Sequence, residues 1–487
     1  MSTQVPITVV ILAAGAGTRM KSTLPKVLHP LSGRTLLGHA IAAAEALSPE
    51  QTAVVVRHQR DLVAAEAQKC LPSAVIVDQD DIPGTGRATQ CAIDALDAAA
   101  GAAISGAVVV TASDVPLQDA DTLQRLVDAH VDAGSAVTVL STILDDSTGY
   151  GRILRDADGN VIGSVEQKDA NAEQLAIKEI NSGTYVFDAD VLRRALNTVT
   201  TDNAQGEMYL PDVIAFAHNE GRPLQAVITD DPWTVEGTND RAQLAALGTE
   251  LNRRIVERWM LAGVTCVDPA TTWIDVDVTL EQDVTLLPGV QLHGATVIKS
   301  GAVVGPDSTL TDTVVAEGAS VVRTHAFSAD IGPEATVGPF TYLRPGTVLG
   351  KKGKIGGFCE TKNAKLGEGT KLPHLSYAGD VTIGDGTNIG AATIVANYDG
   401  VNKHSSVIGS HVRVGSDSVI VAPVTIGDGA YTAAGSVITE DVAPGALGIG
   451  RARQTALEGW TARKRPGTAS DSAAQAASGA VSSSTEA

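Results

Sequence analysis

Aromatic residues and cysteines are scarce in this chain. Aromatic side chains make up 3% of its 487 residues, whereas glycine occurs 49 times. We therefore expect cores of aliphatic and β-branched side chains joined by tight turns. The cysteines, Cys70, Cys91, Cys266 and Cys359, form no C-x-x-C pair. Such spacing favours neither a zinc site nor a disulfide framework, and it is typical of a reducing cytoplasm.

Long apolar runs and excess positive charge are also missing. No apolar run reaches about 18 residues, and Met1–Pro6 lacks the charged segment that opens a signal peptide. The net charge of −20 disfavours nucleic acid and anionic membranes as partners. We expect a cytoplasmic protein with no nucleic-acid and no membrane partner, in which a local group of cations binds any anionic ligand.

The first half of the chain alternates short aliphatic runs with amphipathic segments. This order predicts a largely parallel sheet covered by helices on both faces, with ligands beyond the carboxyl ends of its strands. The predicted strands are Ile7–Leu12, Thr52–Val56, Ala74–Val77, Ala107–Ala112 and Ala136–Leu140. The predicted helices are Leu36–Leu47, Arg60–Cys70, Arg87–Leu96, Asp121–Ala133 and a longer one at Asn239–Leu261.

After Gly263 the chain is rich in Val, Ile, Thr, Gly and Asp and has a period of six residues. This period is typical of a parallel β-helix in which each sixth side chain points inward, and it predicts about ten coils across Thr265–Ala446. The repeating positions are Val297, Val303, Thr309, Val315 and Val321; Ile331, Val337, Leu343, Leu349 and Ile355; Ile383, Ile389, Val395 and Val401; and Ile408, Val414, Ile420, Ile426, Thr432 and Ile438.

The period breaks between Val321 and Ile331, between Ile355 and Ile383, and at Asn397–Ser406. Insertions into a solenoid form loops on one face, which is often the binding face. We therefore expect extra residues, and a site, at these breaks. The last residues, 466–487, are rich in Ser and Ala with little apolar bulk, which predicts a disordered tail.

The segment ILAAGAGTRMKSTLPKVLHPL, residues 11–31, follows the first predicted strand and has the character of a phosphate-binding loop. It is neither a dinucleotide fingerprint nor a Walker A loop, because both need glycine where Met20 stands. Its glycines let the amides of residues 13–17 approach phosphate, and Arg19 and Lys26 add positive charge. Asp114, after another predicted strand, faces the same crevice and is a suitable oxygen ligand for Mg²⁺.

These features together resemble one bacterial family, the bifunctional N-acetylglucosamine-1-phosphate uridylyltransferase/glucosamine-1-phosphate N-acetyltransferases. The resemblance spans residues 7–465 and rests on LAAGAGTRM, PKVLH, GTGRA, GYGRI, EINSGTY, TYLRPG, PHLSYAGD, NIGAATIVANYDG and VAPVTIGDGAY. It implies a Rossmann-like α/β nucleotidyltransferase domain over 1–238, a linker helix over 239–263, and a left-handed parallel β-helix acetyltransferase domain of hexapeptide repeats over 264–465. It also implies a homotrimer formed through the β-helix.

The family implies two consecutive reactions on one chain. The second domain acetylates glucosamine 1-phosphate with acetyl-CoA. The first domain, with Mg²⁺, joins UTP and N-acetylglucosamine 1-phosphate into UDP-N-acetylglucosamine, a precursor of peptidoglycan and lipopolysaccharide, and releases pyrophosphate.

The resemblance also assigns the contacts of the first reaction. Arg19 and Lys26 are its catalytic cations, and Mg²⁺ is held by Asp114 and Asn239, although Asn239 on its own reads as a helix N-cap. The family usually has glycine where this chain has Ser113. The further nucleotide and sugar contacts are Leu12, Ala13, Ala14, Gly15, Gln79, Gly84, Thr85, Ala112, Ser113, Gly151, Glu166, Asn181 and Thr184.

Acetyl transfer needs a neutral amine and hence a base that works near neutral pH. The resemblance makes His374, within one of the period breaks, that general base. It assigns phosphate and sugar contacts to Arg344, Lys362, Tyr377 and Asn388, and the acetyl-CoA groove to Ala391, Asn397, Tyr398, Ser416, Ala434 and Arg451. Direct transfer requires no cysteine, so Cys359 is interpreted as structural.

Two other functions compete with this interpretation. The chain can be a pyrophosphorylase whose solenoid serves only assembly or regulation, because fold alone does not fix function. It can also be a non-catalytic scaffold. The joint presence of His374, Arg344, Lys362 and the NYDG motif disfavours the first alternative, and Lys26 with Asp114 disfavours the second.

Overall fold

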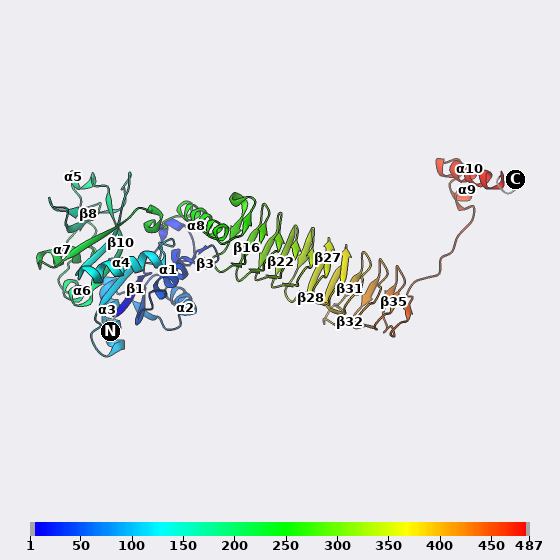
Figure 1. The fold of residues 1–487 in the computed structure, drawn as a ribbon, viewed down its shortest axis with the longest axis horizontal. Helices are drawn as coiled ribbons and strands as arrows, with labels where there is room; N and C mark the ends of the chain where they lie inside the picture. The colour runs from blue at the N-terminus through cyan, green and yellow to red at the C-terminus, as the bar shows by residue number, and fades with distance from the viewer. Residues whose placement is uncertain (1–4, 484–487) are drawn as a thin grey trace. The chain divides into compact units, whose positions relative to one another are not determined.

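The structure is a computed structural model in which residues 5–483 are described. The chain divides into two compact units, Met1–Glu334 and Ala335–Ala487. Figure 1 labels helices and strands along the chain. The boundaries predicted at 238/239 and 263/264 both fall inside the first unit. In residues 5–483, no helix has both the length and the apolar character needed to cross a bilayer.

The first unit begins with a mixed sheet in the order β11-β7-β10-β6-β1-β4-β5, to which the β8–β9 hairpin adds at β10. The predicted parallel pairing holds for these strands, since β1 pairs in parallel with β4 and β6, and β4 with β5. However, β10 runs antiparallel to β6 and β7, so the sheet is only partly parallel. The strands are β1 (Ile7–Leu12), β4 (Gln51–Val56), β5 (Val75–Asp78), β6 (Ala107–Ala112), β7 (Val137–Ile143), β8 (Gly151–Arg155), β9 (Val161–Val165), β10 (Glu179–Asp188) and β11 (Leu224–Thr229), with a separate pair β2 (Pro30–Leu31) and β3 (Arg34–Thr35).

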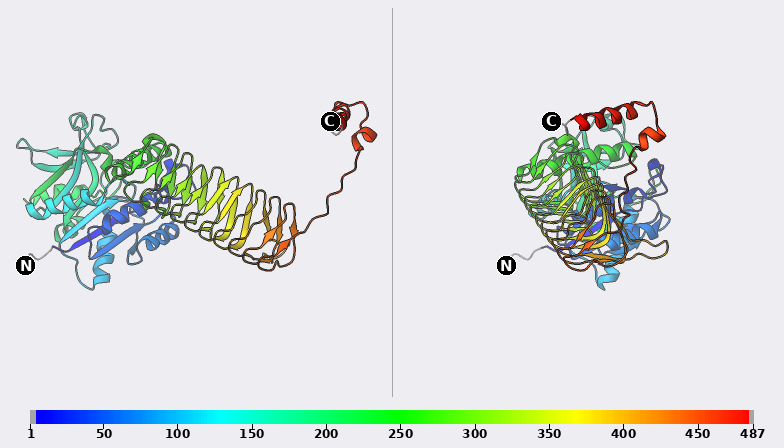
Figure 2. Two further views of the ribbon diagram at one scale, coloured as in Figure 1. Left: turned by 45° about the vertical axis from the view of Figure 1, so that its right-hand side comes forward. Right: turned by 90° about the vertical axis from the view of Figure 1, so that its right-hand side faces the viewer.

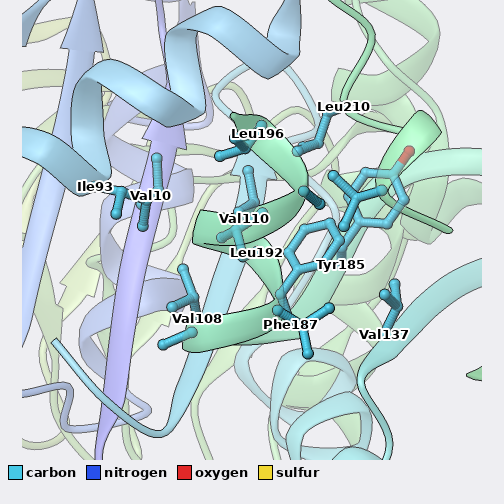
Figure 3. Packing of buried hydrophobic residues seen from close by; sticks show 14 of the residues in the cluster. Val10, Ile93, Val108, Val110, Val137, Tyr185, Phe187, Leu192, Leu196 and Leu210 are labelled. Carbon is cyan, nitrogen blue, oxygen red and sulfur yellow. The ribbon is translucent and has the colours of Figure 1, made fainter. Parts of the chain in front are cut away.

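Both faces of this sheet are buried, which explains the continuous aliphatic runs of its strands. Val10 packs with Val108, Val110 and the stacked rings of Tyr185 and Phe187, whose centroids are 5.2 Å apart (Figure 3). Side chains of alternating direction, such as Val9 and Ile11, fill the core on the opposite face. The first core is completed by α3 (Thr85–Ala100), α6 (Ala189–Leu196) and α7 (Asp212–Asn219), and the second by α1 (Leu36–Glu45), α2 (Arg60–Cys70) and α4 (Ala120–Ala133).

The predicted long helix is α8 (Arg241–Leu261). Its N-cap is Asp240, whose side chain accepts from the amides of Ala242 and Gln243, so the N-cap interpretation of Asn239 is wrong. The side chain of Asn252 binds the backbone of Thr272 and Ile274 and so ties α8 to the first coil. The short α5 (Ala172–Leu175) lies between β9 and β10.

The first coils of the left-handed parallel β-helix follow α8 in the first unit (Figure 2). Their inward residues are Ile274, Leu280, Leu286, Leu292, Ile298, Val304, Leu310, Val315, Val321, Ala326 and Ile331. The inward prediction is therefore wrong for Val297, Val303 and Thr309, which lie one residue before the buried ones. The steps 310–315, 321–326 and 326–331 are five residues long, so the break after Val321 shortens turns and inserts nothing. The strands are β12 (Thr265–Cys266), β13 (Trp273–Ile274), β14 (Thr279–Leu280), β15 (Thr285–Leu286), β16 (Gln291–His293), β17 (Val297–Ile298), β18 (Val303–Val304), β19 (Thr309–Thr311), β20 (Val314–Val315), β21 (Ser320–Val321), β22 (Thr324–Phe327) and β23 (Asp330–Ile331).

The second unit continues with coils that keep the predicted inward positions from Val337 to Ile355 and from Ile408 to Ile438. No insertion lies between Ile355 and Ile383, because Thr361, Leu366, Leu372 and Ala378 occupy the inward positions there. The break expected here was wrong, because small or polar side chains such as Thr361 and Ala378 occupy some of the inward positions and hide the aliphatic period. The strands are β24 (Thr336–Val337), β25 (Thr341–Leu343), β26 (Val348–Leu349), β27 (Lys354–Gly357), β28 (Glu360–Leu366), β29 (Lys371–His374), β30 (Tyr377–Ile383), β31 (Ile394–Ala396), β32 (Ser406–Ile408), β33 (Val419–Val421), β34 (Thr425–Ile426), β35 (Tyr431–Thr432), β36 (Val437–Ile438) and β37 (Leu447–Gly448).

The break at Asn397–Ser406 is a true insertion. Val381 pairs with Ser406, 25 residues later, whereas Val407 pairs with Thr425, 18 residues later. Val401 lies in this inserted loop and is 82% exposed, so its predicted inward position is wrong.

The C-terminal segment differs from the predicted disordered tail. It forms α9 (Trp460–Lys464) and α10 (Ala469–Ser483), while residues 484–487 of that prediction lie outside the described chain. Alanine has the strongest intrinsic preference for helix, which the lack of apolar bulk does not remove.

Candidate functional site

A cavity of about 760 Å³ lies beyond the carboxyl ends of β1, β4, β5 and β6. Its position is the one expected for a ligand of a parallel α/β sheet. It brings together predicted residues from three separate segments of the chain: Leu12, Ala14, Gly15, Lys26, Gln79, Gly84, Thr85, Ala112, Ser113 and Asp114. It is also lined by Arg57, His58 and Gln59, which the sequence analysis missed although they directly follow β4.

The opening loop folds tightly over Lys26. Gly17 has φ +60°, and a Cβ there would lie 2.5 Å from the Cβ of Lys26, so only glycine fits this turn. The amide of Ala13 donates to the carbonyl of Val55 at 2.9 Å, and the residue is 2% exposed. The expectation that this amide approaches a phosphate is therefore wrong, because β4 already uses it.

Each predicted metal ligand is paired with one predicted phosphate-binding cation. The ammonium of Lys26 donates to Oδ2 of Asp114, and Arg19 Nη2 donates to Oδ1 of Asn239 at 2.7 Å. The amide of Thr238 donates to the Asp114 carbonyl at 2.9 Å, which places the neighbouring Asn239 beside the cavity. The four groups expected at the triphosphate therefore lie together at this edge of the sheet.

Ser113 stands where the family usually has glycine, and its hydroxyl is used internally. It donates to the carbonyl of Leu12 at 2.7 Å, as does the Ser113 amide at 3.1 Å. The substitution therefore adds a second bond between β6 and β1, and the hydroxyl does not project freely into the cavity.

The side chain of Gln79 is oriented by the backbone of its own loop. Its Nε2 donates to the carbonyls of Ile82, at 3.0 Å, and Gly84, at 3.2 Å. Because the amide protons are used in this way, Oε1 remains as an acceptor in the cavity wall. Such an acceptor matches the N–H of a uracil ring.

A smaller cavity of about 210 Å³ adjoins the first one, since Leu12, Thr85 and Gly183 line both. It contains the predicted sugar contacts Gly151, Glu166 and Asn181. Burial, with Asp169, Asp212 and Glu207 nearby, raises the pKa of Glu166. Thr184 was also expected at the sugar, but its side chain is 1% exposed and binds Gln118, so direct contact of that side chain is wrong.

A group of cations lies on the solenoid of the second unit. The neighbouring side chain of Lys403, and then burial, lower the pKa of Lys362, while the nearby carboxylate of Asp380 partly opposes this shift. Glu360 accepts from Arg344 Nη1 at 2.9 Å and holds that guanidinium in place. Three neighbouring positive charges favour an anion such as phosphate. Lys403, in the inserted loop, was missed by the sequence analysis.

A close approach at Gly379 brings two predicted substrate contacts together. A Cβ at this position would lie 2.4 Å from the Tyr377 hydroxyl and 2.7 Å from Asn397 Nδ2. Burial alone would raise the pKa of Asp380, but hydrogen bonds from Asn363 and Asn397 lower it overall. Gly379 and Asp380 belong to the quoted motif PHLSYAGD, which was the signal that could have identified them.

His374 lies exposed at the end of β29, in an unbroken coil. Its exposure therefore results from an outward position next to the turn at Leu375, φ +51°, and not from an insertion. In the same unit, the backbone of Asn388 forms isolated parallel β-bridges with Lys371 and Arg413. The backbone amide of Asp417 donates to the Ala391 carbonyl at 2.7 Å, and the amide of Gly435 donates to the Ser416 carbonyl at 2.8 Å.

The remaining predicted residues of the acetyl-CoA groove lie in the inserted loop and the last coils. Tyr398 is exposed and donates to the Gly400 carbonyl at 2.7 Å. Ala434 is exposed next to Gly435, and a Cβ added at Gly435 would lie 3.8 Å from Arg451 Cδ. Cys359 is buried, and its thiol donates to backbone carbonyls, which is consistent with a structural role.

Comparisons with known proteins match both halves of the chain. Residues 9–148 match the MobA-like NTP transferase domain, and residues 405–440 match six repeats of the bacterial transferase hexapeptide. The chain is 60% identical to the "Bifunctional protein GlmU" of Pseudarthrobacter chlorophenolicus, over 97% of this chain and 96% of that protein. It is 59% identical to that of Kineococcus radiotolerans, over 98% and 96%, and 55% identical to that of Corynebacterium glutamicum, over 96% and 96%.

Proposed function

Because the chain belongs to the family of bifunctional GlmU proteins, we propose that its two groups of residues are the two active sites of that family. The chain is a transferase that makes UDP-N-acetylglucosamine for cell-wall synthesis. It acetylates glucosamine 1-phosphate with acetyl-CoA and then transfers uridylyl from UTP to the N-acetylated product. We assign the first reaction to residues 264–465 and the second to residues 1–238.

The observation that carries the proposal is the cation group Arg344, Lys362 and Lys403 on the solenoid. Tyr377 lies near Arg344, and Asp380, the partner of Asn397, lies near Lys362. A solenoid that served only assembly would gain little from placing Lys403 beside Lys362, because the two like charges repel one another. The nearby carboxylates of Glu360 and Asp380 offset this repulsion only in part. A sugar phosphate relieves that repulsion. The alternative of a pyrophosphorylase with a purely structural β-helix is therefore disfavoured.

In uridylyl transfer, the chain must bring two anions together and stabilise charge on the α-phosphate. Lys26 can move from Asp114, and Arg19 from Asn239, to a phosphate oxygen of the nucleotide. The oxygen atoms of Asp114 and Asn239 are then free to bind Mg²⁺. Gln79 Oε1 accepts from the uracil ring, and the carboxylate of Glu166 contacts the sugar in the adjoining cavity. Asn181 lies in the wall of that cavity, where its side-chain amide already binds Ser164, Tyr185 and the amide of Gly183. The sugar phosphate oxygen then attacks the α-phosphorus, and pyrophosphate leaves.

The oxygen atoms of Asp114 and Asn239 are the donor types that Mg²⁺ prefers. Within residues 5–483, no three or more His, Cys, Asp or Glu side chains are grouped to hold a metal ion. The proposed site needs no such group, because Mg²⁺ usually takes most of its ligands from phosphate and water. Bound there, it would neutralise phosphate charge.

In acetyl transfer, His374 takes a proton from the amino group of glucosamine 1-phosphate, so that the nitrogen lone pair can attack the thioester carbonyl. The C–S bond then breaks, and CoA leaves as a thiol after protonation. Arg344, Lys362 and Lys403 hold the phosphate of the acceptor. The backbone near Ala391 can polarise the carbonyl, and Asn397, Tyr398, Ser416, Ala434 and Arg451 line the path of CoA.

Two further expectations extend the proposal. The exposed aliphatic side chains along the solenoid, such as Ile394, Val407 and Val437, suit a homotrimer that packs through the β-helix. The cysteines, all unpaired in the described chain, suit the cytoplasm.

The proposal is tested by two assays on the purified wild-type protein with Mg²⁺. We expect pyrophosphate release from UTP and N-acetylglucosamine 1-phosphate, and thiol release from acetyl-CoA and glucosamine 1-phosphate. A protein that releases pyrophosphate but never a thiol would be the pyrophosphorylase of the alternative. A protein that releases neither would contradict both assignments.

A further inference from the structure

A buried group of three polar side chains lies close to both cavities of the first unit. Thr111 on β6, Gln118 and Thr184 on β10 are each at most 5% exposed. The Thr111 hydroxyl donates to Gln118 Oε1 at 2.6 Å, and Gln118 Nε2 donates to the Thr184 hydroxyl at 3.0 Å. In the described chain none of the three lines either cavity. A substrate in either cavity would therefore not contact these three side chains directly.

The group joins the two segments that carry the proposed metal and sugar contacts. Gln118 lies four residues after Asp114, in a turn where the backbone amide of Gln118 donates to the Val115 carbonyl at 3.3 Å. Thr184 follows Gly183, which lines both cavities, within the bulge of β10 between Asn181 and Tyr185. The hydrogen bond from Gln118 to Thr184 is thus a direct link between the Asp114 turn and the Asn181 bulge.

Such a group is costly unless all its members are paired. A buried amide or hydroxyl without a partner loses its hydration and gains nothing in return, whereas apolar side chains of similar shape could fill the same space. The neighbouring positions Val110 and Tyr185 belong to an apolar core. A paired polar group in this place fixes one relative position of the two segments, because any shift leaves a donor or acceptor unpaired.

We propose that Gln118 and Thr184 are positioning residues for uridylyl transfer, holding the Asp114 turn at a fixed distance from the Asn181 bulge. This inference rests on the proposed function of the first unit. In-line transfer requires the attacking oxygen about 3–3.5 Å from phosphorus, and a misplacement of about 1 Å can cost 10²-fold in rate. The link therefore acts on kcat, while the separate binding of UTP is little changed.

The test compares two substitutions at one position. Thr184→Val keeps the shape and removes the hydroxyl, whereas Thr184→Ser keeps the hydroxyl and removes a methyl group. We expect Thr184→Val to lower kcat for pyrophosphate release by about tenfold with the KM for UTP within about twofold. Thr184→Ser should keep kcat within about threefold of wild type, and both variants should retain wild-type acetyl transfer.

A merely structural role predicts that Thr184→Val unfolds at a lower temperature, because the buried side chain of Gln118 loses its partner, but keeps the wild-type kcat per folded molecule. Wild-type kcat in folded Thr184→Val therefore overturns the proposal, as does a kcat in Thr184→Ser that falls as far as in Thr184→Val. A cycle with Gln118→Leu gives an independent measurement: losses that do not add in the double variant support the link, and additive losses overturn it. Wild-type protein without pyrophosphate release would overturn the proposed function and this inference together, whereas an active wild type with an equally active Thr184→Val overturns the inference alone.

Discussion

The sheet of the first unit and the solenoid of the second build their sites in opposite ways. The cavity of about 760 Å³ in the first unit gathers loops from positions as distant as Leu12 and Glu207, at one edge of a sheet. The solenoid places side chains by register: Glu360 lies beside Tyr377, and Tyr377 beside Ile394, in successive parallel strands. A site of the first kind depends on loop conformation and buried links, whereas one of the second kind depends on where the period is kept and where it is interrupted.

The interruption that matters in the solenoid is the loop Asn397–Ser406. It supplies Asn397, Tyr398 and Lys403, and it is held internally by His404, whose Nε2 lies 2.7 Å from Asp399 Oδ2. That contact and the amides of Asn402 and Val401 lower the pKa of Asp399 to about 2. The insertion extends the chain outward from the regular coils, and it leaves Tyr398 and Val401 60% and 82% exposed.

The largest effect that would break only the solenoid site is expected at Gly379. In Gly379→Ala the new methyl group would overlap Tyr377 and Asn397, and we expect thiol release to fall by about 10²-fold because both side chains must move. Gly357→Ala is the matched control, since its Cβ would meet nothing closer than 3.4 Å. Wild-type acetyl transfer in Gly379→Ala would show that neither side chain is needed where it stands.

The role of the inserted loop is sharpened by comparing two lysines. Lys403→Ala should raise the KM for glucosamine 1-phosphate by about tenfold, because one charged contact to phosphate is lost. Lys365→Ala removes an exposed lysine on a regular strand, β28, and should leave that KM unchanged. Equal KM values for the two variants, measured by initial rates of thiol release, would place the phosphate elsewhere.

The register of the first coils is tested by stability. Ile298 is fully buried, whereas Val297 is only partly buried. Ile298→Ala should lower the free energy of unfolding by about 2–4 kcal/mol, and Val297→Ala by less than about 1 kcal/mol. Urea denaturation measures both. A larger loss of unfolding free energy in Val297→Ala than in Ile298→Ala would show that Val297 points inward, as the six-residue period predicted.

The sheet region should also differ from the solenoid in its response to acid. Burial lowers the pKa of His130 to about 4. Between about pH 6.5 and pH 4, His130 is therefore protonated in the unfolded chain but neutral in the folded protein. Stability is therefore complete at neutral pH and falls as the pH drops from about 7 towards 4, by roughly 3 kcal/mol at most. His130→Asn should weaken this pH dependence, and an unchanged slope in urea denaturation would contradict it.

The architecture was largely predictable because both kinds of region repeat a simple pattern. Aliphatic runs identified β1, β4 and β6, and the motifs identified Lys26 and Asp114 at one edge of the sheet. The register at Val297 was not predictable, because Val297 and Ile298 are both aliphatic and a five-residue step looks like a break. Lys403 and Gln118 were missed since their roles depend on contacts with Lys362 and Thr184, which lie far away in sequence.

The independence of the two sites is tested most directly by measuring both activities in Lys26→Ala and His374→Ala. We expect Lys26→Ala to lose at least about 10²-fold in pyrophosphate release and to keep wild-type thiol release. His374→Ala should lose at least about 10²-fold in thiol release and keep wild-type pyrophosphate release. Loss of both activities in either variant, each folded as judged by its thermal unfolding, would contradict the account of two separate sites on one chain.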